Sequence, residues 1–227
     1  MEDSVLFRRF ADALAGRTIP QDAARELAVR MEEDLGVRDG VLLMSAYGMD
    51  AGKAWRFSAD PKAHEKEVVA LMAPAFDAPK PPVPARHIEA ACAALATIAA
   101  SAPDASQALA IAAYTLWFVG RDLLAGSLMR AALDRDEDNS LAAMVEDAIE
   151  RGIHPACVKG QFSRRRRSEI SVAHGGGAAK GPGRQRAGAH DGDGESRNKN
   201  TRKDKENDHR NRHQHRKTYF RQASRHP

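Results

Sequence analysis

The stretch ALAIAAYTLWFVGRDLLAGSLMRAALDRDEDNSLAAMVEDAIERG, from Ala108 to Gly152, decides the fold of this chain. Its apolar residues recur at intervals of three and four, which places them on one face of a helix. Gly120 interrupts the pattern, an acidic segment interrupts it again at 134–138, and Gly152 follows the last apolar residue. The stretch therefore predicts helices at about 105–118, 121–134 and 139–151, each with an apolar face that needs a partner.

The same helical spacing runs through the sequence before position 103. It predicts helices at about 4–16, 20–35, 60–74 and 85–102, with Pro74 ending the third because a proline disfavours helical geometry at the residue before it. Residues 37–49 contain a Val-Leu-Leu-Met run that fits a helix or a buried strand equally well.

Turn and capping residues separate these segments. The proline-rich segment at 78–84 predicts an extended bend within one domain. Short polar side chains favour the first position before a helix, so we expect Asp104 to cap one helix and Asp138 or Asn139 to cap the last.

Charge divides the 227 residues into two parts. Residues 1–160 contain 17 Lys and Arg against 24 Asp and Glu, a net charge of −7, whereas residues 161–227 contain 18 against 7, a net charge of +11. Apolar residues are sparse after position 161, so this segment cannot offset an ordering cost of about 1–2 kcal/mol per residue. We predict a compact all-α domain over 1–156 and a long, disordered basic tail over 157–227.

The densest charge in the tail is a run of four arginines, Arg164, Arg165, Arg166 and Arg167. Clustered arginines bind phosphate backbones and release counterions. Aromatic residues for base stacking are nearly absent from the run, so we expect any nucleic-acid binding to be independent of sequence. The alternative is a solvated tail with no ligand.

Enzyme motifs are not evident in the sequence, and we predict no catalytic, cofactor-binding or metal-binding residues and no cofactor. Carboxylates cluster at 32–34 and 134–138, which fits acid–base or cation chemistry but more simply fits solvated helix ends. Cys92 and Cys157 lack Cys-x-x-Cys spacing; we expect Cys92 to be buried, Cys157 to be exposed, and the protein to be cytoplasmic. The first residues do not resemble a secretory signal, and no apolar run is long enough to span a membrane.

Three neighbouring aromatic residues are the candidate contacts for a protein partner: Tyr114, Trp117 and Phe118. One helix can scarcely bury all three, so we expect them to form an exposed apolar groove. Arg38 and Asp39 also stand out, because both lie beside an apolar run. They fit an internal ion pair or cap, or alternatively a polar contact to a partner.

Two resemblances follow from these motifs. Gly120, Ala125, Met129 and Ala132 have the small–large–small spacing of the second half of a tetratricopeptide-type repeat, although Glu137 stands where such repeats carry proline. Over roughly 20–156 the chain also resembles the C-terminal half of the domain of unknown function 4192 family of actinobacteria and their phages. The matching positions are Arg38-Asp39, Trp117, Gly120, Ala132-Leu133, Ser140-Leu141-Ala142, Gly152 and Pro155.

That family resemblance implies no activity, and the α/β half typical of the family has no counterpart here. We therefore expect a non-enzymatic helical module that binds a protein partner. One alternative is an accessory protein that binds nucleic acid through its basic tail. Another is a remnant or subunit of a larger protein with α/β and α parts.

The tail hypothesis predicts a difference in DNA binding between the full chain and a 1–158 truncation. Full-length protein should bind at low salt and lose affinity steeply as salt rises, because binding through arginines releases counterions. The truncation should not bind. Fluorescence anisotropy of labelled DNA across a salt series measures both, and equal binding by the two proteins would contradict the hypothesis.

Overall fold

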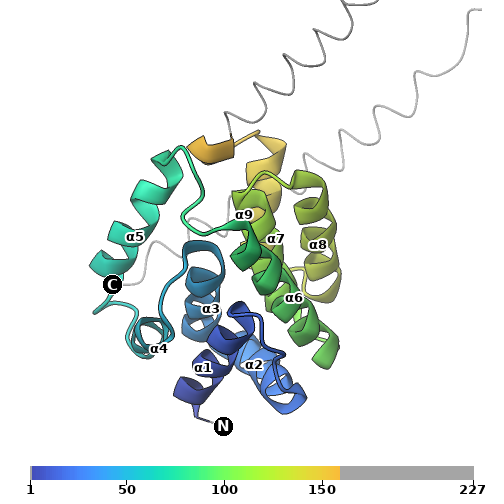
Figure 1. Cartoon of the computed structure of the whole chain (residues 1–227). Coiled ribbons are helices and arrows are strands. Elements are labelled where there is room, and N and C mark those ends of the chain that lie inside the picture. The colour runs from blue at the N-terminus through green and yellow to red at the C-terminus, as the bar shows by residue number, and fades with distance from the viewer. Residues whose placement is uncertain (1, 159–227) are drawn as a thin grey trace, which may run out of the picture. The chain divides into compact units, whose positions relative to one another are not determined.

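A computed structural model describes residues 2–158 and places nine helices in this range (Figure 1). The chain divides into two units, 1–177 and 178–227, and every described residue belongs to the first. The helices are α1 (Asp3–Leu14), α2 (Gln21–Glu33), α3 (Leu35–Tyr47), α4 (Ala51–Ala59), α5 (Glu65–Asp77), α6 (Ala85–Ser101), α7 (Ser106–Phe118), α8 (Asp122–Arg135) and α9 (Ser140–Glu150). No strand occurs among residues 2–158, which confirms the prediction of a helical domain.

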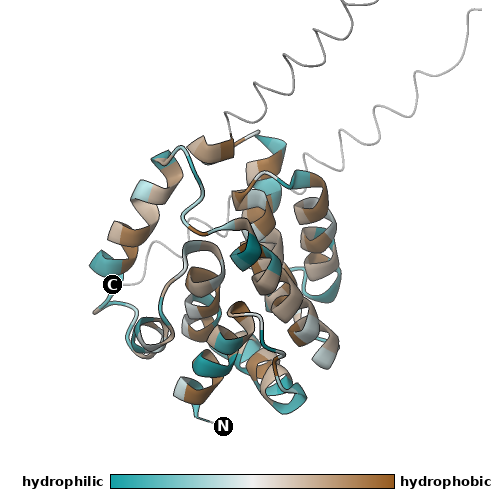
Figure 2. Ribbon diagram, in the orientation of Figure 1, coloured by the Kyte–Doolittle hydropathy of each residue, from teal (hydrophilic) through white to brown (hydrophobic). Residues whose placement is uncertain are grey.

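Helix α7 is the hub of the packing. Twelve of its thirteen residues are buried, and it contacts α2, α3, α6, α8 and α9. A helix that is apolar on every side has to be surrounded, because any exposed face would leave apolar surface in water. The outer helices are amphipathic instead, and Figure 2 shows hydrophobic and hydrophilic residues side by side on α1 and α5.

The first turn of α7 is capped by a residue that is far away in the sequence. Glu32, near the end of α2, accepts hydrogen bonds from the backbone N–H of Gln107 at 2.8 Å and from the Ser106 hydroxyl at 3.0 Å. The first N–H groups of a helix have no partner within it, and a carboxylate there also complements the helix dipole. The prediction that Asp104 caps this helix is wrong. The residue at the cap position is Ala105, which makes no side-chain cap hydrogen bond.

The same network extends to α9. Asn139 donates from its side-chain amide to the Ser106 hydroxyl at 3.0 Å and accepts from the backbone N–H of Ala142 at 3.0 Å. This confirms Asn139, rather than Asp138, as the cap of the last helix. Because Asn139 and Ser106 are both buried, the network satisfies polar groups that would otherwise be costly to take out of water.

The Val-Leu-Leu-Met run lies in a helix, α3, which ends at Tyr47. Asp34 caps α3 by accepting from the backbone N–H of Gly36 at 2.8 Å, and Gly48 ends the helix in the left-handed conformation, with φ 71°. Gly40 lets α1 approach closely, because a Cβ there would lie 2.9 Å from the Phe7 ring. Helix α4, which follows at Ala51–Ala59, is not among the predicted helices.

Pro74 does not end its helix, contrary to the prediction. Helix α5 continues past it to Asp77, although a proline in a helix interior costs about 3 kcal/mol. Tertiary contacts account for the last turn, because Ala75 is buried and Phe76 packs against the core. The proline segment then turns the chain towards α6, with Val83 buried.

Replacing Glu32 tests the cap on α7. Glu32→Ala leaves two buried donors without their acceptor, so we expect a loss of about 1.5–3 kcal/mol in the free energy of unfolding. Glu33→Ala, at the neighbouring and exposed position, should cost about 0.5 kcal/mol or less. Urea denaturation of both variants measures the difference, and equal losses would show that the cap does not hold the hub.

Candidate functional site

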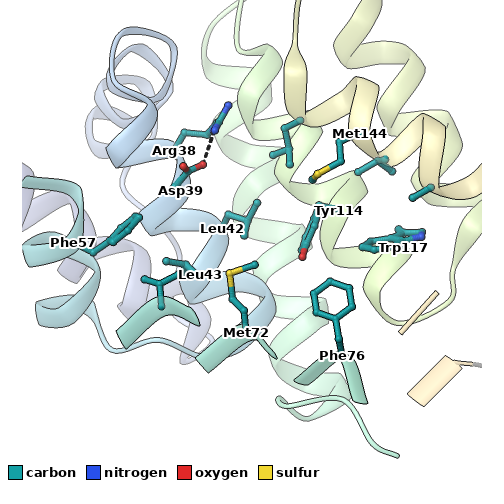
Figure 3. Close-up of a pocket in the computed structure, with 14 residues that line it drawn as sticks. Arg38, Asp39, Leu42, Leu43, Phe57, Met72, Phe76, Tyr114, Trp117 and Met144 are labelled. Carbon is teal, nitrogen blue, oxygen red and sulfur yellow. Dashed lines mark hydrogen bonds and ion pairs between the residues drawn. The ribbon is translucent and has the colours of Figure 1, made fainter. Parts of the chain in front are cut away.

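A pocket of about 320 Å³ opens between α3, α4, α5, α7 and α9. Figure 3 shows labelled side chains from these helices converging on it. We call it the central pocket. Its lining residues are Arg38, Asp39, Leu42, Leu43, Phe57, Val68, Met72, Phe76, Tyr114, Trp117, Leu141, Met144, Val145 and Ala148.

Helical spacing builds two walls of the central pocket. Val68, Met72 and Phe76 follow one another at intervals of four on α5. On α9, Leu141, Val145 and Ala148 repeat at intervals of four and three. Residues at these intervals share one helix face, so both helices present an apolar stripe to the same space. The spacing of the α9 stripe is visible in the sequence, although the stripe is not among the predicted site residues.

The three aromatic residues predicted to form an exposed groove are buried. Their exposed fractions are 3% for Tyr114, 4% for Trp117 and 0% for Phe118. The expectation of exposure is wrong because α7 is covered on all sides, so one helix does bury all three. Tyr114 and Trp117 still line the central pocket, whereas Phe118 is not among its lining residues.

Hydrogen bonds satisfy the polar ends of these rings. The Tyr114 hydroxyl lies 2.5 Å from the Tyr47 hydroxyl, and the Trp117 indole N–H donates to the Ile153 carbonyl at 3.0 Å. Phe118 contacts the Tyr47 and Phe76 rings edge-on, at centroid distances of 5.0 and 5.4 Å. Such edge contacts add to the stabilisation from burial alone.

Arg38 and Asp39 supply the only charges among the lining residues of the pocket. The Arg38 guanidinium donates from Nε to Oδ1 of Asp39 at 2.8 Å, and Nη2 lies 2.7 Å from the same oxygen in an ion pair. Nη1 lies 3.5 Å from the Ser140 hydroxyl. The two residues therefore form the internal ion pair that was one of the two interpretations, and Figure 3 places the pair at one edge of the pocket.

Reactive groups are few in the described part of the chain. Residues 2–158 contain no group of three His, Cys, Asp or Glu residues arranged to hold a metal ion. Cys157 is buried, which corrects the expectation of an exposed thiol, and its thiol donates to the Phe118 carbonyl at 3.7 Å. Burial raises the pKa of both cysteine thiols, so neither Cys92 nor Cys157 is an activated nucleophile.

The remaining predicted contacts, Arg164, Arg165, Arg166 and Arg167, lie outside the described residues, as does the tail from position 159 onward. Among the described residues, no helix is both long enough and apolar enough to cross a bilayer.

Comparisons of the chain with protein-family models, curated proteins and solved structures give no match.

The buried tyrosines predict a loss of stability at alkaline pH. Burial raises the pKa of Tyr114 to about 12 and also raises the pKa of Tyr47. An unfolded tyrosine loses its proton near pH 10, so this contribution is complete below pH 10 and is lost as the pH rises through 12. We expect the free energy of unfolding to fall by on the order of 1 kcal/mol between pH 9 and pH 11 on account of Tyr114.

Urea denaturation at the two pH values measures this fall. The double variant Tyr47→Phe, Tyr114→Phe is the control, because it keeps both rings and removes both ionising hydroxyls. It should lose less stability over the same interval, and an identical loss would contradict the assignment.

Proposed function

We propose that this chain is a non-enzymatic interaction module whose central pocket receives an apolar side chain from a partner protein. The pocket itself carries the proposal: it is apolar over most of its lining and has a single charged edge. Proteins that bind partner helices commonly take large apolar anchor residues into grooves between their own helices.

The volume of the pocket fits such an anchor. Pockets that take small ligands have volumes of about 300–1,000 Å³, so the central pocket, at about 320 Å³, lies at the small end of this range. Such a space has room for one large apolar or aromatic side chain. The aromatic and thioether groups of Tyr114, Trp117 and Met72 would supply most of the contact surface.

The edge of the pocket favours a protein partner over a small molecule. Met144 lines the pocket, yet it is 51% exposed. A partner helix seated on α9 would cover this side chain, whereas a molecule held only inside the pocket would leave it in water. Methionine suits such a contact because its flexible side chain adapts to different surfaces.

The chemistry of the lining supports binding over catalysis. Arg38 and Asp39 neutralise each other, and Tyr114 has its pKa raised to about 12, far from the pH at which a general base would work. The similarity of α7 and α8 to a tetratricopeptide-type hairpin agrees with this proposal, since such hairpins commonly present binding surfaces.

Filling the pocket tests the proposed function. Helical peptides are selected from a phage-displayed random library on the full chain, and their affinities are measured for two variants. Ala148→Phe places a ring in the pocket and should weaken binding at least about tenfold, as expected when a central anchor is lost. Ala96→Phe, on the exposed side of α6, is the matched control and should bind as the unaltered chain does.

Circular dichroism and thermal melts establish that both variants fold. Peptides that bind Ala148→Phe as tightly as the unaltered chain would contradict the proposed function, because they would be held elsewhere. Failure to select any peptide with a large apolar residue would contradict it as well.

A further inference from the structure

We infer that the partner segment is an amphipathic helix with a carboxylate beside its apolar anchor, and that Arg38 receives this carboxylate at the edge of the pocket. The inference rests on the proposed function, because it concerns the chemistry of whatever enters the same site.

The bonding of Arg38 leaves donors free for this role. A guanidinium carries five N–H groups. Nε and Nη2 both point at one oxygen atom, Oδ1 of Asp39, and Nη1 has only a long contact of 3.5 Å to Ser140 among the described residues. Two or more N–H groups on the outer nitrogens are therefore without a close acceptor in the described part of the chain.

Most of the Arg38 side chain is withdrawn from water. The Arg38 side chain is only 12% exposed, whereas the Asp39 side chain is 41% exposed. A donor that is partly withdrawn from water gains more from an incoming acceptor than a fully hydrated one does, because less water has to be displaced. Asp39 is better hydrated and its Oδ1 already accepts from Arg38, so a partner gains less by replacing water at this carboxylate than by supplying an acceptor to Arg38.

A charged acceptor suits Arg38 better than a neutral one. Hydrogen bonds between guanidinium and carboxylate groups are shorter and about twice as strong as those between neutral groups, and they are often bidentate. The two outer nitrogens of Arg38 can offer such a pair of donors. The preference of Arg38 for a carboxylate is local. The negative net charge of residues 1–160 as a whole would by itself attract basic partners.

The position of Arg38 fixes where the carboxylate must be. Arg38 lines the same pocket that would hold the anchor, so anchor and carboxylate have to lie close together. On a helix, residues three or four apart have their Cβ atoms about 5–6 Å from one another. We therefore place Asp or Glu three or four residues from the apolar anchor.

A charge exchange tests the inference. The double variant Arg38→Glu, Asp39→Arg keeps an ion pair at the edge of the pocket. It puts a carboxylate at position 38, so that hydrogen-bond acceptors replace the donors that Arg38 offers to a ligand. Selection of helical peptides on the unaltered full chain should enrich Asp or Glu three or four positions from a large apolar residue. Selection on the exchanged chain should enrich Lys or Arg at that position instead. Acidic enrichment on both chains, or no charge preference on the unaltered chain, would overturn the inference.

A second measurement does not depend on the exchanged chain folding. One selected peptide and its Glu→Gln or Asp→Asn counterpart are titrated against the unaltered chain and against Arg38→Met, which keeps the length of the side chain. Neutralising the peptide should weaken binding to the unaltered chain about tenfold and leave binding to Arg38→Met nearly unchanged. An equal effect on both chains would overturn the role of Arg38.

The two proposals fail in different ways. If peptides carry an apolar anchor and are lost on Ala148→Phe but show no charge preference, the pocket is a binding site and the role of Arg38 is wrong. If the peptides ignore Ala148→Phe, the proposed function itself is wrong.

Discussion

Burial of α7 on every side is the constraint on which the rest of the described structure depends. Its residues leave no polar face, so α2, α3, α6, α8 and α9 pack against it, and Phe76 of α5 contacts its last turn. A buried helix end is costly unless its backbone groups find partners. Glu32 meets that need at the first turn of α7 by accepting from the backbone N–H of Gln107. Glu32 and Asn139 also bond to the Ser106 hydroxyl, which ties α2 and the start of α9 to the hub.

The central pocket arises from the same arrangement. Tyr114 and Trp117 bring bulky rings to the part of α7 that meets α5 and α9, and Tyr47 satisfies the Tyr114 hydroxyl from α3. Large rings of fixed shape leave space between them that Met72 and Met144 border without closing. The pocket is thus bounded by groups held in the core, and a bound side chain would meet a preformed surface rather than one that orders on binding.

Local sequence patterns predicted most of the helices. They gave wrong predictions where contacts between residues far apart in the sequence determine the structure. The boundaries of α6 to α9 follow from apolar spacing and glycine turns, each within two residues. Spacing could not show that Glu32 caps a helix more than seventy residues away, or that contacts of Phe76 carry α5 beyond Pro74. The burial of Tyr114, Trp117 and Phe118 is a third case, because exposure depends on how many helices gather around α7, which no single stretch encodes. The sequence alone marks Arg38 and Asp39 as unusual. Only the fold shows that they lie at the edge of a pocket.

Methyl NMR tests most directly whether a helical peptide binds in the central pocket. The full chain carries labelled methionine methyl groups, and a selected peptide is added stepwise. Met72 and Met144 line the central pocket, whereas Met31 and Met129 are buried elsewhere in the core. If the peptide binds in the central pocket, the methyl signals of Met72 and Met144 should shift in proportion to binding, and those of Met31 and Met129 should stay in place. Unchanged Met72 and Met144 signals at saturation, with shifts confined to the other methionines, would contradict binding in this pocket.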